Sequence, residues 1–401
     1  MREFKSLMPF HKALDLALES SIPTEKTEEV DLESALGRIL ARELTSPMNV
    51  PGYTRAAMDG YALNSDDTSA ASEESKLSLR ITGEIFAGDT SKIVVTTGES
   101  VKIATGGMLP EGADAVIPFE KVEEQAGSII LNKPVERGAS LGLAGEDIKK
   151  GEVVLNEGII LHSAHLGAAA SIGIGTLECY RKPEVAIAVS GDEIAEVGKE
   201  LGEGQVYDTN SYTLSAIVEK GGGESVKLPI VRDSVESIEN SINSSDADII
   251  AFTGGSSVGE RDLIVDAVRN LGEVIFHGIT VKPGKPTLLG RVNGKLILGM
   301  PGYPTSCLTV AAVILAPMLR KISRIDGELH STTIEAELGE TLTSKKELHQ
   351  IVTVRIDKGT AIPVFKSSSV ITSMSKADGY VELPYGITEI RQGEKVKVTL
   401  L

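Results

Sequence analysis

Two lysines that could hold an anion stand close together in the stretch "VKPGKP" (281–286). Lys282 and Lys285 flank a Pro-Gly turn. A lysine ammonium is a compact point charge that suits a phosphate or another oxyanion. Proline restricts the path of such a loop, and glycine lets the backbone approach a ligand closely. The stretch therefore predicts a phosphorylated or oxyanionic ligand.

Acidic and amide side chains follow several apolar runs in the same part of the chain. They are Asp192 and Glu193, Asp208 with Asn210, Asp233, and Glu260 with Asp262. Mg²⁺ is usually held by one or two carboxylates together with waters and substrate phosphates. Lysines and carboxylates that converge at one place would suit a phosphorylated ligand with a divalent ion.

A glycine-rich stretch, "TGGSSVGERD" (253–262), links the apolar run "ADIIAFT" to the segment "RDLIVDAVRNLG". The run is typical of a buried strand, and the segment is typical of a helix. Backbone N–H groups between a strand and a helix N-terminus can hold an anion. A tight turn ahead of a capped helix explains the stretch as well.

Each of the other candidate residues also has an ordinary structural explanation. Asp233 could cap the helix that follows it, and Asp262 could be a first-turn acid that the helix dipole favours. Glu193 and the two lysines could simply be solvated. The six histidines have no metal-ligand spacing and are expected to be structural or exposed. Cys307 lies in an apolar helix and is expected in the core.

The elements that must position these residues alternate from about residue 180 onward between strands and helices. This alternation predicts a parallel sheet with helices on both faces, and such sheets bind ligands beyond the carboxyl ends of their strands. Before it, two helices are expected, in "HKALDLALESSI" and in "VDLESALGRILAREL", where Asp31 would be the N-cap. In the first, Leu14, Leu18 and Ile22 fall four residues apart, and in the second, Leu32, Leu36, Ile39 and Leu40 make one apolar face.

The fold class expected is therefore multidomain α/β and β. We predict a discontinuous, elongated helical domain from residues 1–50 and 140–178, a small all-β domain at 51–139, an α/β domain at 179–326 and a C-terminal β-barrel at 327–401. The short alternating strands of the second and fourth segments carry turn residues between them.

Composition limits the partners of the chain. Its net charge of −17 argues against nucleic acid as the main partner. No apolar run is expected to reach the roughly 18 residues of a membrane span, and charges interrupt the first 20 residues, unlike a signal peptide. The two cysteines, Cys179 and Cys307, suit a reduced, cytoplasmic setting.

Eight motifs in this order resemble the MoeA-type molybdopterin molybdotransferases, a fold that also occurs in the C-terminal part of gephyrin-like proteins. They are "AAMDGYAL" (56–63), "TTGESVKIATGGMLPEGADAVIPFE" (96–120), "GEDIKKGEVVL" (145–155), "VSGDEI" (189–194), "VYDTNSYTL" (206–214), "TGGSSVGERD" (253–262), "VKPGKP" (281–286) and "GMPGYPTS" (299–306). The tail "SSSVITSMSKADGYVELP" also resembles the family, so the resemblance covers nearly the whole chain.

The resemblance implies an activity and its cofactors. Family members insert molybdate, or tungstate, into adenylylated molybdopterin with Mg²⁺ and release AMP. They act as homodimers in which residues of the β domain reach the site of the other subunit. A separate molybdopterin adenylyltransferase would supply the substrate, and neither nucleic acid nor a membrane is expected as a partner.

The resemblance also assigns site residues. The catalytic set is Asp59, Glu193, Asp233, Asp262, Lys282 and Lys285, of which Asp233 and Asp262 would bind Mg²⁺. The set that binds molybdopterin is Thr105, Asp147, Gly254, Gly255, Ser256, Ser257, Pro301 and Pro304. Two positions depart from the family: Tyr303 stands where Asn is frequent, and Ala56 where Ser is frequent.

Three rival functions fit the sequence less well. An adenylyltransferase of the same pathway and a nicotinamide-nucleotide amidase would share only the α/β domain. A receptor scaffold would need a long linker, which this sequence does not contain.

Overall fold

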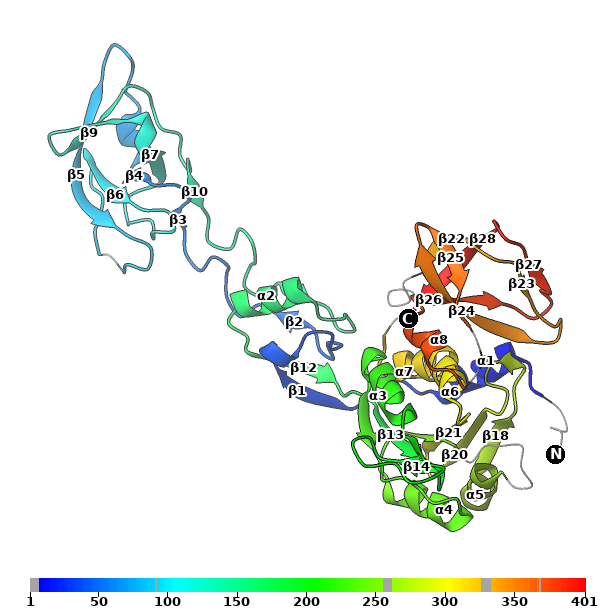
Figure 1. Ribbon diagram of the computed structural model, residues 1–401. Coiled ribbons are helices and arrows are strands. Elements are labelled where there is room, and N and C mark those ends of the chain that lie inside the picture. Colours follow the sequence, from blue (N-terminus) through cyan, green and yellow to red (C-terminus); the bar gives the residue numbers. More distant parts are fainter. Residues whose placement is uncertain (1–6, 91, 255–261, 326–332, 366, 368) are drawn as a thin grey trace. The chain divides into compact units, whose positions relative to one another are not determined.

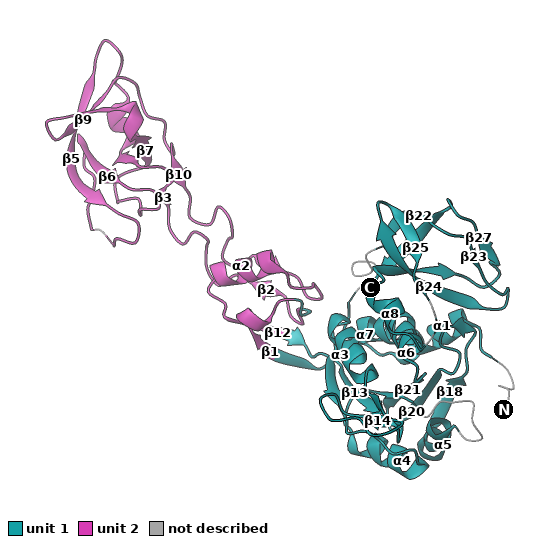
Figure 2. Ribbon diagram, viewed as in Figure 1, with its two compact units in different colours: residues 1–28, 37–39, 179–401 teal, residues 29–36, 40–178 magenta. Residues whose placement is uncertain are grey.

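A computed structural model describes residues 7–90, 92–254, 262–325, 333–365, 367 and 369–401. The chain separates into two compact units (Figure 2). Unit 1 contains residues 1–28, 37–39 and 179–401, and unit 2 contains residues 29–36 and 40–178.

Unit 1 is built around a six-stranded sheet with the order β16-β13-β17-β21-β20-β18 (Figure 1). Four strands are parallel: β16 (Glu224–Lys227), β13 (Glu184–Val189), β17 (Ile249–Thr253) and β21 (Lys295–Met300). The other two, β20 (Leu288–Val292) and β18 (Glu273–His277), join in antiparallel pairs. The predicted parallel sheet is thus confirmed for four strands, and an antiparallel pair extends it.

Helices cover both faces of this sheet. Alternate residues of one strand enter different cores: Ile249 and Ala251 pack on one face, and Ile250 and Phe252 on the other. The first core includes α3 (Asn210–Lys220), α6 (Pro304–Val310), the π-helical turn Ala311–Leu315, and α7 (Ala316–Ile322). The second includes α4 (Val235–Ser244) and α5 (Leu263–Leu271). Because side chains alternate across a strand, a strand that is apolar throughout needs helices on both faces of its sheet.

The helical segment Pro304–Ile322 is long and apolar enough to cross a membrane, contrary to the expectation for this chain. Of its apolar window, 72% is buried inside the protein. Its side chains form much of the core on one face of the sheet. The segment therefore behaves as the core helix of a globular unit.

The first predicted helix is confirmed as α1 (Phe10–Ser20), and Leu14 of its apolar row is partly buried against the core of unit 1. Phe10, Ala13 and Ala17 enter the core of unit 1, whereas Ile22 lies beyond the helix and is 75% exposed. The sequence analysis placed this helix in the discontinuous domain. It packs with the α/β sheet instead, because its apolar stripe completes the core beside α7.

The second predicted helix is wrong. Residues Thr27–Asp31 form strand β1, which pairs with β12 (Thr176–Tyr180), and only a 3₁₀ turn, Leu32–Ser34, follows. Asp31 makes no side-chain cap there. Gly37 has a φ of +76°, which a helix cannot contain. Leu36 is accordingly 65% exposed, although Ile39 and Leu40 are buried.

Unit 2 contains the predicted small β unit. Its sheet has the order β7-β4-β6-β5-β9-β8. The strands are β4 (Gly60–Leu63), β5 (Leu77–Ile85), β6 (Glu99–Ile103), β7 (Ala115–Pro118), β8 (Glu123–Gln125) and β9 (Ser128–Leu131). The short pairs β2–β11 (Leu44–Thr45, Val153–Leu155) and β3–β10 (Arg55–Ala56, Leu141–Gly142) and helix α2 (Ser163–Ser171) complete the unit.

The C-terminal barrel is confirmed as a closed ring of five strands. They are β22 (Thr333–Leu338), β24 (His349–Asp357), β25 (Thr360–Pro363), β26 (Gly379–Leu383) and β28 (Lys395–Leu400), and β24 pairs with β26 to close the ring. The remaining short elements of unit 1 are β14 (Ile194–Ala195), β15 (Val206–Tyr207), β23 (Leu342–Thr343), β27 (Glu389–Ile390) and α8 (Thr372–Ser375).

One strand ties the barrel to the α/β part of unit 1. Strand β19 (Val281–Lys282) belongs to the "VKPGKP" stretch and pairs in parallel with β24. Lys282 lies opposite Gln350 in this pair. The barrel therefore helps to fix the loop that carries both predicted anion-binding lysines.

Candidate functional site

The chain segments directly after three parallel strands meet at the carboxyl edge of the sheet. They begin at Ser190 after β13, at Gly254 after β17 and at Pro301 after β21, and of the second segment the structure describes Gly254 and then Asp262. Gly254 has a φ of +93°, and a Cβ there would lie 2.1 Å from the Ser190 carbonyl oxygen. A Cβ on Gly302 would lie 3.3 Å from the Gly254 Cα. Such close approach of three backbones requires glycine at these positions.

Asn210 joins these loops to the start of α3. Its Nδ2 donates to Thr253 Oγ1 at 2.5 Å and to the Gly302 carbonyl at 2.8 Å. The side chain is almost fully buried, and Asn210 Oδ1 has no hydrogen-bond partner among the described residues. A buried polar atom without a hydrogen-bond partner destabilises the folded protein by about 1–3 kcal/mol. A residue that carries this cost is a candidate for a functional role.

Asp233, Asp192 and Glu193 form an acidic group beside these loops. Partial burial is the main cause that raises the pKa of Asp233, and the charges of Asp192 and Glu193 raise it further. Ser190 Oγ and the Asp192 N–H oppose this shift, although Ser190 Oγ makes no hydrogen bond of ordinary geometry with a described residue. Asp233 does not cap α4, because Ser234 does so by accepting from the Ser237 N–H.

The surroundings of Asp262 differ from those of Asp233. Asp262 is the N-cap of α5, with Oδ1 accepting from the Val265 N–H at 3.3 Å. Its Oδ2 lies 2.9 Å from His277 Nε2, at the end of β18. The structural explanation of Asp262 is therefore confirmed, and a binding role would be additional. His277 is a site candidate that the sequence analysis treated as structural.

The carboxylates at this edge of the sheet fit a Mg²⁺ ion that also has ligands from outside the protein. Among the described residues, no group of three or more His, Cys, Asp and Glu side chains is arranged to hold a metal by itself. A cation beside Asp233 would relieve its repulsion from Asp192 and Glu193. This fits an ion held by one or two carboxylates, with the other ligands from substrate phosphates and water.

Replacing Asp233 with Asn is expected to stabilise the metal-free protein at neutral pH. The pKa of Asp233 is raised on folding, so the unfolded chain loses this proton first as the pH rises above 3.8. The Asp233 carboxylate therefore destabilises the folded protein fully at a pH above its folded-state pKa, and not at all well below pH 3.8. We therefore expect a higher Tm for Asp233→Asn at pH 7 in EDTA, and no difference at pH 3. An unchanged Tm at pH 7 would contradict this account, and Asp246→Asn serves as the surface control.

Lys282 and Lys285 are exposed on a loop whose backbone is closely held. The Ile279 N–H donates to the Lys285 carbonyl at 3.0 Å, and the Gly278 N–H donates to the Thr287 carbonyl at 2.8 Å. A Cβ on Gly284 would lie 2.6 Å from Val310 Cγ2, so the loop is packed on α6. The loop is thus rigid, while both lysine side chains face solvent.

The Pro-Gly-Tyr-Pro turn connects β21 to α6. Pro304 is the first residue of the helix, where the missing N–H of proline costs no hydrogen bond. Tyr303 precedes it, is 62% exposed and makes no side-chain cap. The departure at Tyr303 therefore adds an exposed ring beside Pro301 and Pro304.

Three predicted site residues belong to unit 2. Asp59 accepts from the Thr105 N–H and from Thr105 Oγ1, both at 2.7 Å, and these two bonds lower its pKa. Asp147 is exposed, and its N–H donates to the Val50 carbonyl at 3.1 Å. The structure thus brings Asp59 and Thr105 together. Gly255, Ser256, Ser257 and Glu260 lie outside the described residues.

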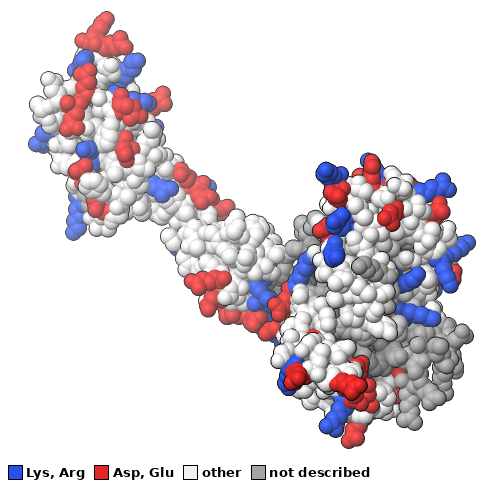
Figure 3. Space-filling view, viewed as in Figure 1, with Lys and Arg blue, Asp and Glu red and all other residues white. Residues whose placement is uncertain are grey.

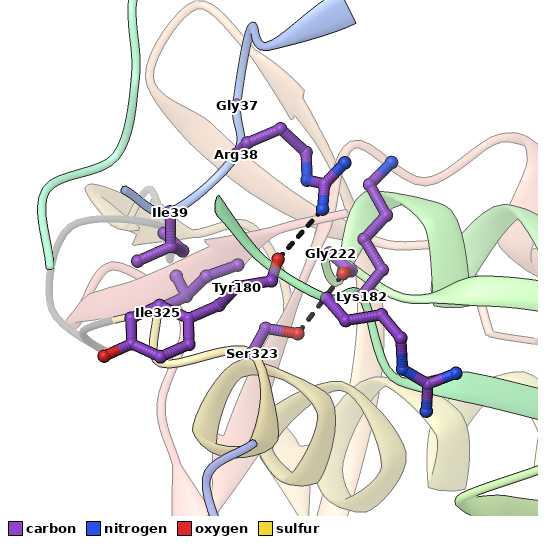
Figure 4. A pocket seen from close by; sticks show the side chains of 9 residues that line it. Gly37, Arg38, Ile39, Tyr180, Lys182, Gly222, Ser323 and Ile325 are labelled. Carbon is purple, nitrogen blue, oxygen red and sulfur yellow. Dashed lines mark hydrogen bonds between the residues drawn. The ribbon is translucent and has the colours of Figure 1, made fainter. Parts of the chain in front are cut away.

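A small cavity elsewhere in unit 1 is lined by basic side chains (Figure 4). It has a volume of about 20 Å³, and Arg38 and Arg181 line it. Arg38 donates to the Tyr180 carbonyl at 2.9 Å and pairs with Glu28, while Arg181 pairs with Asp248 at 3.0 Å. Acids thus pair with both arginines, and Lys182 is a third basic residue that lines the cavity.

Positive and negative side chains are mixed on the surface. On the face drawn in Figure 3, the described lysines and arginines are interspersed with aspartates and glutamates on each unit. This face of the described residues has no continuous basic surface. That nucleic acid is not a partner remains a prediction.

Family models match three consecutive regions of the chain. Residues 8–173 match the MoeA N-terminal region (domain I and II). Residues 186–321 match the model described as "Probable molybdopterin binding domain". Residues 335–401 match the MoeA C-terminal region (domain IV).

Relatives along the whole chain agree with these models. A Methanocaldococcus jannaschii protein named for molybdopterin biosynthesis is 33% identical over 100% of both chains. The molybdopterin molybdenumtransferase of Haemophilus influenzae is 37% identical over 75% of this chain and 74% of its own. The crystal structure of the molybdopterin biosynthesis MoeA protein of Pyrococcus horikoshii has a TM-score of 0.87 and 37% identity, covering 98% of this chain and 99% of that one. This chain belongs to the MoeA family.

Proposed function

We propose that this protein is a molybdopterin molybdotransferase. It inserts molybdate or tungstate into adenylylated molybdopterin, releases AMP and requires Mg²⁺. The observation that carries the proposal is the convergence of the Gly254 loop, the acids Asp192, Glu193 and Asp233, and the Pro301 turn at one sheet edge. Relatives named molybdopterin molybdenumtransferase support it.

The substrate explains why lysines and acids would share one site. A phosphoanhydride carries several negative charges, which Lys282 and Lys285 would hold as point charges. Molybdate is itself an oxyanion and needs the same kind of donor. Gly254 has no side chain at this edge, where a Cβ would lie 2.1 Å from the Ser190 carbonyl oxygen. Backbone N–H groups after a strand of this kind would donate to a phosphate.

Cleavage of the anhydride needs no protein nucleophile. Water supplies the oxygen that bonds to phosphorus, the P–O bond to the leaving phosphate breaks, and one proton passes to solvent. Burial raises the pKa of Cys307 to about 12, so the thiol stays protonated and unsuited to attack. Mg²⁺, when bound, would neutralise charge that develops on the phosphate oxygens.

Acidic residues would then position the ion and the water. Asp233 is the better candidate for Mg²⁺, because its neighbours Asp192 and Glu193 disfavour its ionised form until a cation is near. Asp262 would contribute through the carboxylate that already contacts His277. Glu193 and Asp59 would order water or the departing oxo groups.

The assembly is part of the proposal. We propose a cytoplasmic homodimer in which Asp59, Thr105 and Asp147 of one subunit complete the site of the other. A separate adenylyltransferase would supply the adenylylated substrate.

The experiment that tests the function measures AMP release from adenylylated molybdopterin. We expect release with Mg²⁺ and molybdate or tungstate, and a large loss of rate when EDTA removes the metal. Comparison of the two oxyanions shows which one the enzyme prefers. If the folded protein releases no AMP with either oxyanion, the proposal is wrong.

A further inference from the structure

Asn210 is the residue through which two loops of the candidate site are joined. It stands at the first position of α3, yet both described hydrogen bonds of its side chain leave that helix. One bond reaches Thr253, the last residue of β17, directly before Gly254. The other reaches Gly302, in the turn between β21 and α6. One carboxamide therefore sets the separation of the two loops.

The junction that Asn210 makes with Thr253 and Gly302 is buried and closely packed. Asn210 is 6% exposed and Thr253 is fully buried, so water cannot replace the carboxamide without opening the junction. Gly254 and Gly302 approach each other with 3.3 Å between the Gly254 Cα and a Cβ built on Gly302. Asp208 accepts from the Ser211 N–H at 2.9 Å and so holds the start of α3 beside them.

We infer that Asn210 is a positioning residue that holds Thr253 and Gly254, at the end of β17, beside the Pro301–Pro304 turn in the geometry that binds the substrate. It does not need to touch the reacting atoms. When its two donated bonds are lost, the loops should separate locally while the rest of unit 1 stays folded. The part of this inference that concerns the substrate rests on the proposed function, whereas the part that concerns the loops does not.

The two cysteines provide a measurement that needs no turnover. Cys307 lies in the first turns of α6, its thiol interacts with the Thr253 hydroxyl, and it is fully buried. Cys179 is equally buried but belongs to β12. Local opening of the junction should expose Cys307 alone, whereas general destabilisation should expose both thiols.

The experiment labels the native full-length protein with N-ethylmaleimide and follows each cysteine by peptide mass spectrometry. In Asn210→Ala we expect Cys307 to react about tenfold faster or more, since loss of one ordinary hydrogen bond shifts an opening equilibrium by roughly this factor. Cys179 should keep its wild-type rate. Asn210→Leu, which restores most of the volume without donors, should behave like Asn210→Ala.

Two threonine variants complete the test. Thr253→Val removes one acceptor of Asn210 but keeps the bond from Asn210 to the Gly302 carbonyl. We therefore expect a smaller increase in the labelling rate of Cys307. Thr309→Val is the matched control, because Thr309 is also buried and its hydroxyl donates to the Thr305 carbonyl of its own helix. If Asn210→Ala fails to fold, the labelling rate of Cys307 in Thr253→Val tests the inference in its place. Equal increases in the labelling rates of both cysteines, or no increase in the rate of Cys307, would overturn the inference.

Kinetics then separate this inference from the proposed function. If wild-type protein releases AMP, the Asn210 variants should show a KM for adenylylated molybdopterin raised about tenfold, with a smaller change in kcat. An unchanged KM with selective Cys307 labelling would refute the role in substrate binding. If wild-type protein releases no AMP but Asn210→Ala still exposes Cys307 alone, the proposed function fails and the loop-positioning role stands.

Discussion

Gly254→Ala should abolish most of the activity and destabilise unit 1. The new Cβ would lie 2.1 Å from the Ser190 carbonyl oxygen and 3.1 Å from Ser190 Oγ, at a φ of +93°. Neither neighbour can move easily, because the Ser190 N–H is bonded to the Thr253 carbonyl at 2.9 Å. We expect a loss of about 3 kcal/mol or more in stability, typical of a substitution that strains a buried backbone. AMP release should fall at least about 100-fold, since displaced loops lose substrate positioning.

Gly294→Ala is the control for backbone conformation alone. Gly294 has a φ of +81°, but a Cβ there would meet nothing within 4 Å. This variant should lose only about 1 kcal/mol, the ordinary cost of a left-handed alanine, and keep its activity. Thermal unfolding and AMP release distinguish the two variants. If Gly254→Ala is no worse than Gly294→Ala, the close packing of the loops is not as described.

Lys282→Ala and Lys285→Ala should each reduce kcat/KM about 100-fold, the scale of losing one preorganised charge beside a reacting phosphate. Both side chains are exposed, so the variants should keep the wild-type Tm. Lys395→Ala, an exposed lysine of barrel strand β28, is the matched control and should leave kcat/KM unchanged. Near-normal rates in folded Lys282→Ala and Lys285→Ala would exclude these lysines from the site.

The same variants test whether the site is shared between subunits. Lys285→Ala and Asp59→Ala should each be weakly active alone. If Asp59 completes the site of the other subunit, mixing the two proteins under conditions of subunit exchange should restore activity, because mixed dimers then contain one intact site. No recovery in dimers shown to be mixed would mean that each site is made by one chain.

Much of the fold could be predicted because the apolar pattern is local and nearly complete. Every residue of β17 is buried, and the segments 234–244 and 261–272 contain the expected helices α4 and α5, which share one core. The failed prediction of a helix at 30–44 has a different cause. Its apolar spacing fits a helix, but Gly37 and the pairing of β1 with a strand almost 150 residues later decide the outcome.

The sequence by itself determined the parallel sheet, the barrel and the kinds of residue that the site would contain. It did so because strand and helix periodicity and the chemistry of lysine, carboxylate and glycine are properties of short stretches. It left open whether Asp233 and Asp262 cap helices, and it placed Asn210 among the polar side chains after the strands without a role. Only the tertiary structure decided those points, by showing that Ser234 caps α4, that Asp262 caps α5, and that Asn210 bonds to residues 43 and 92 positions away. Hydrogen bonds between distant loops depend on how the whole sheet brings its strand ends together, and no local pattern encodes that.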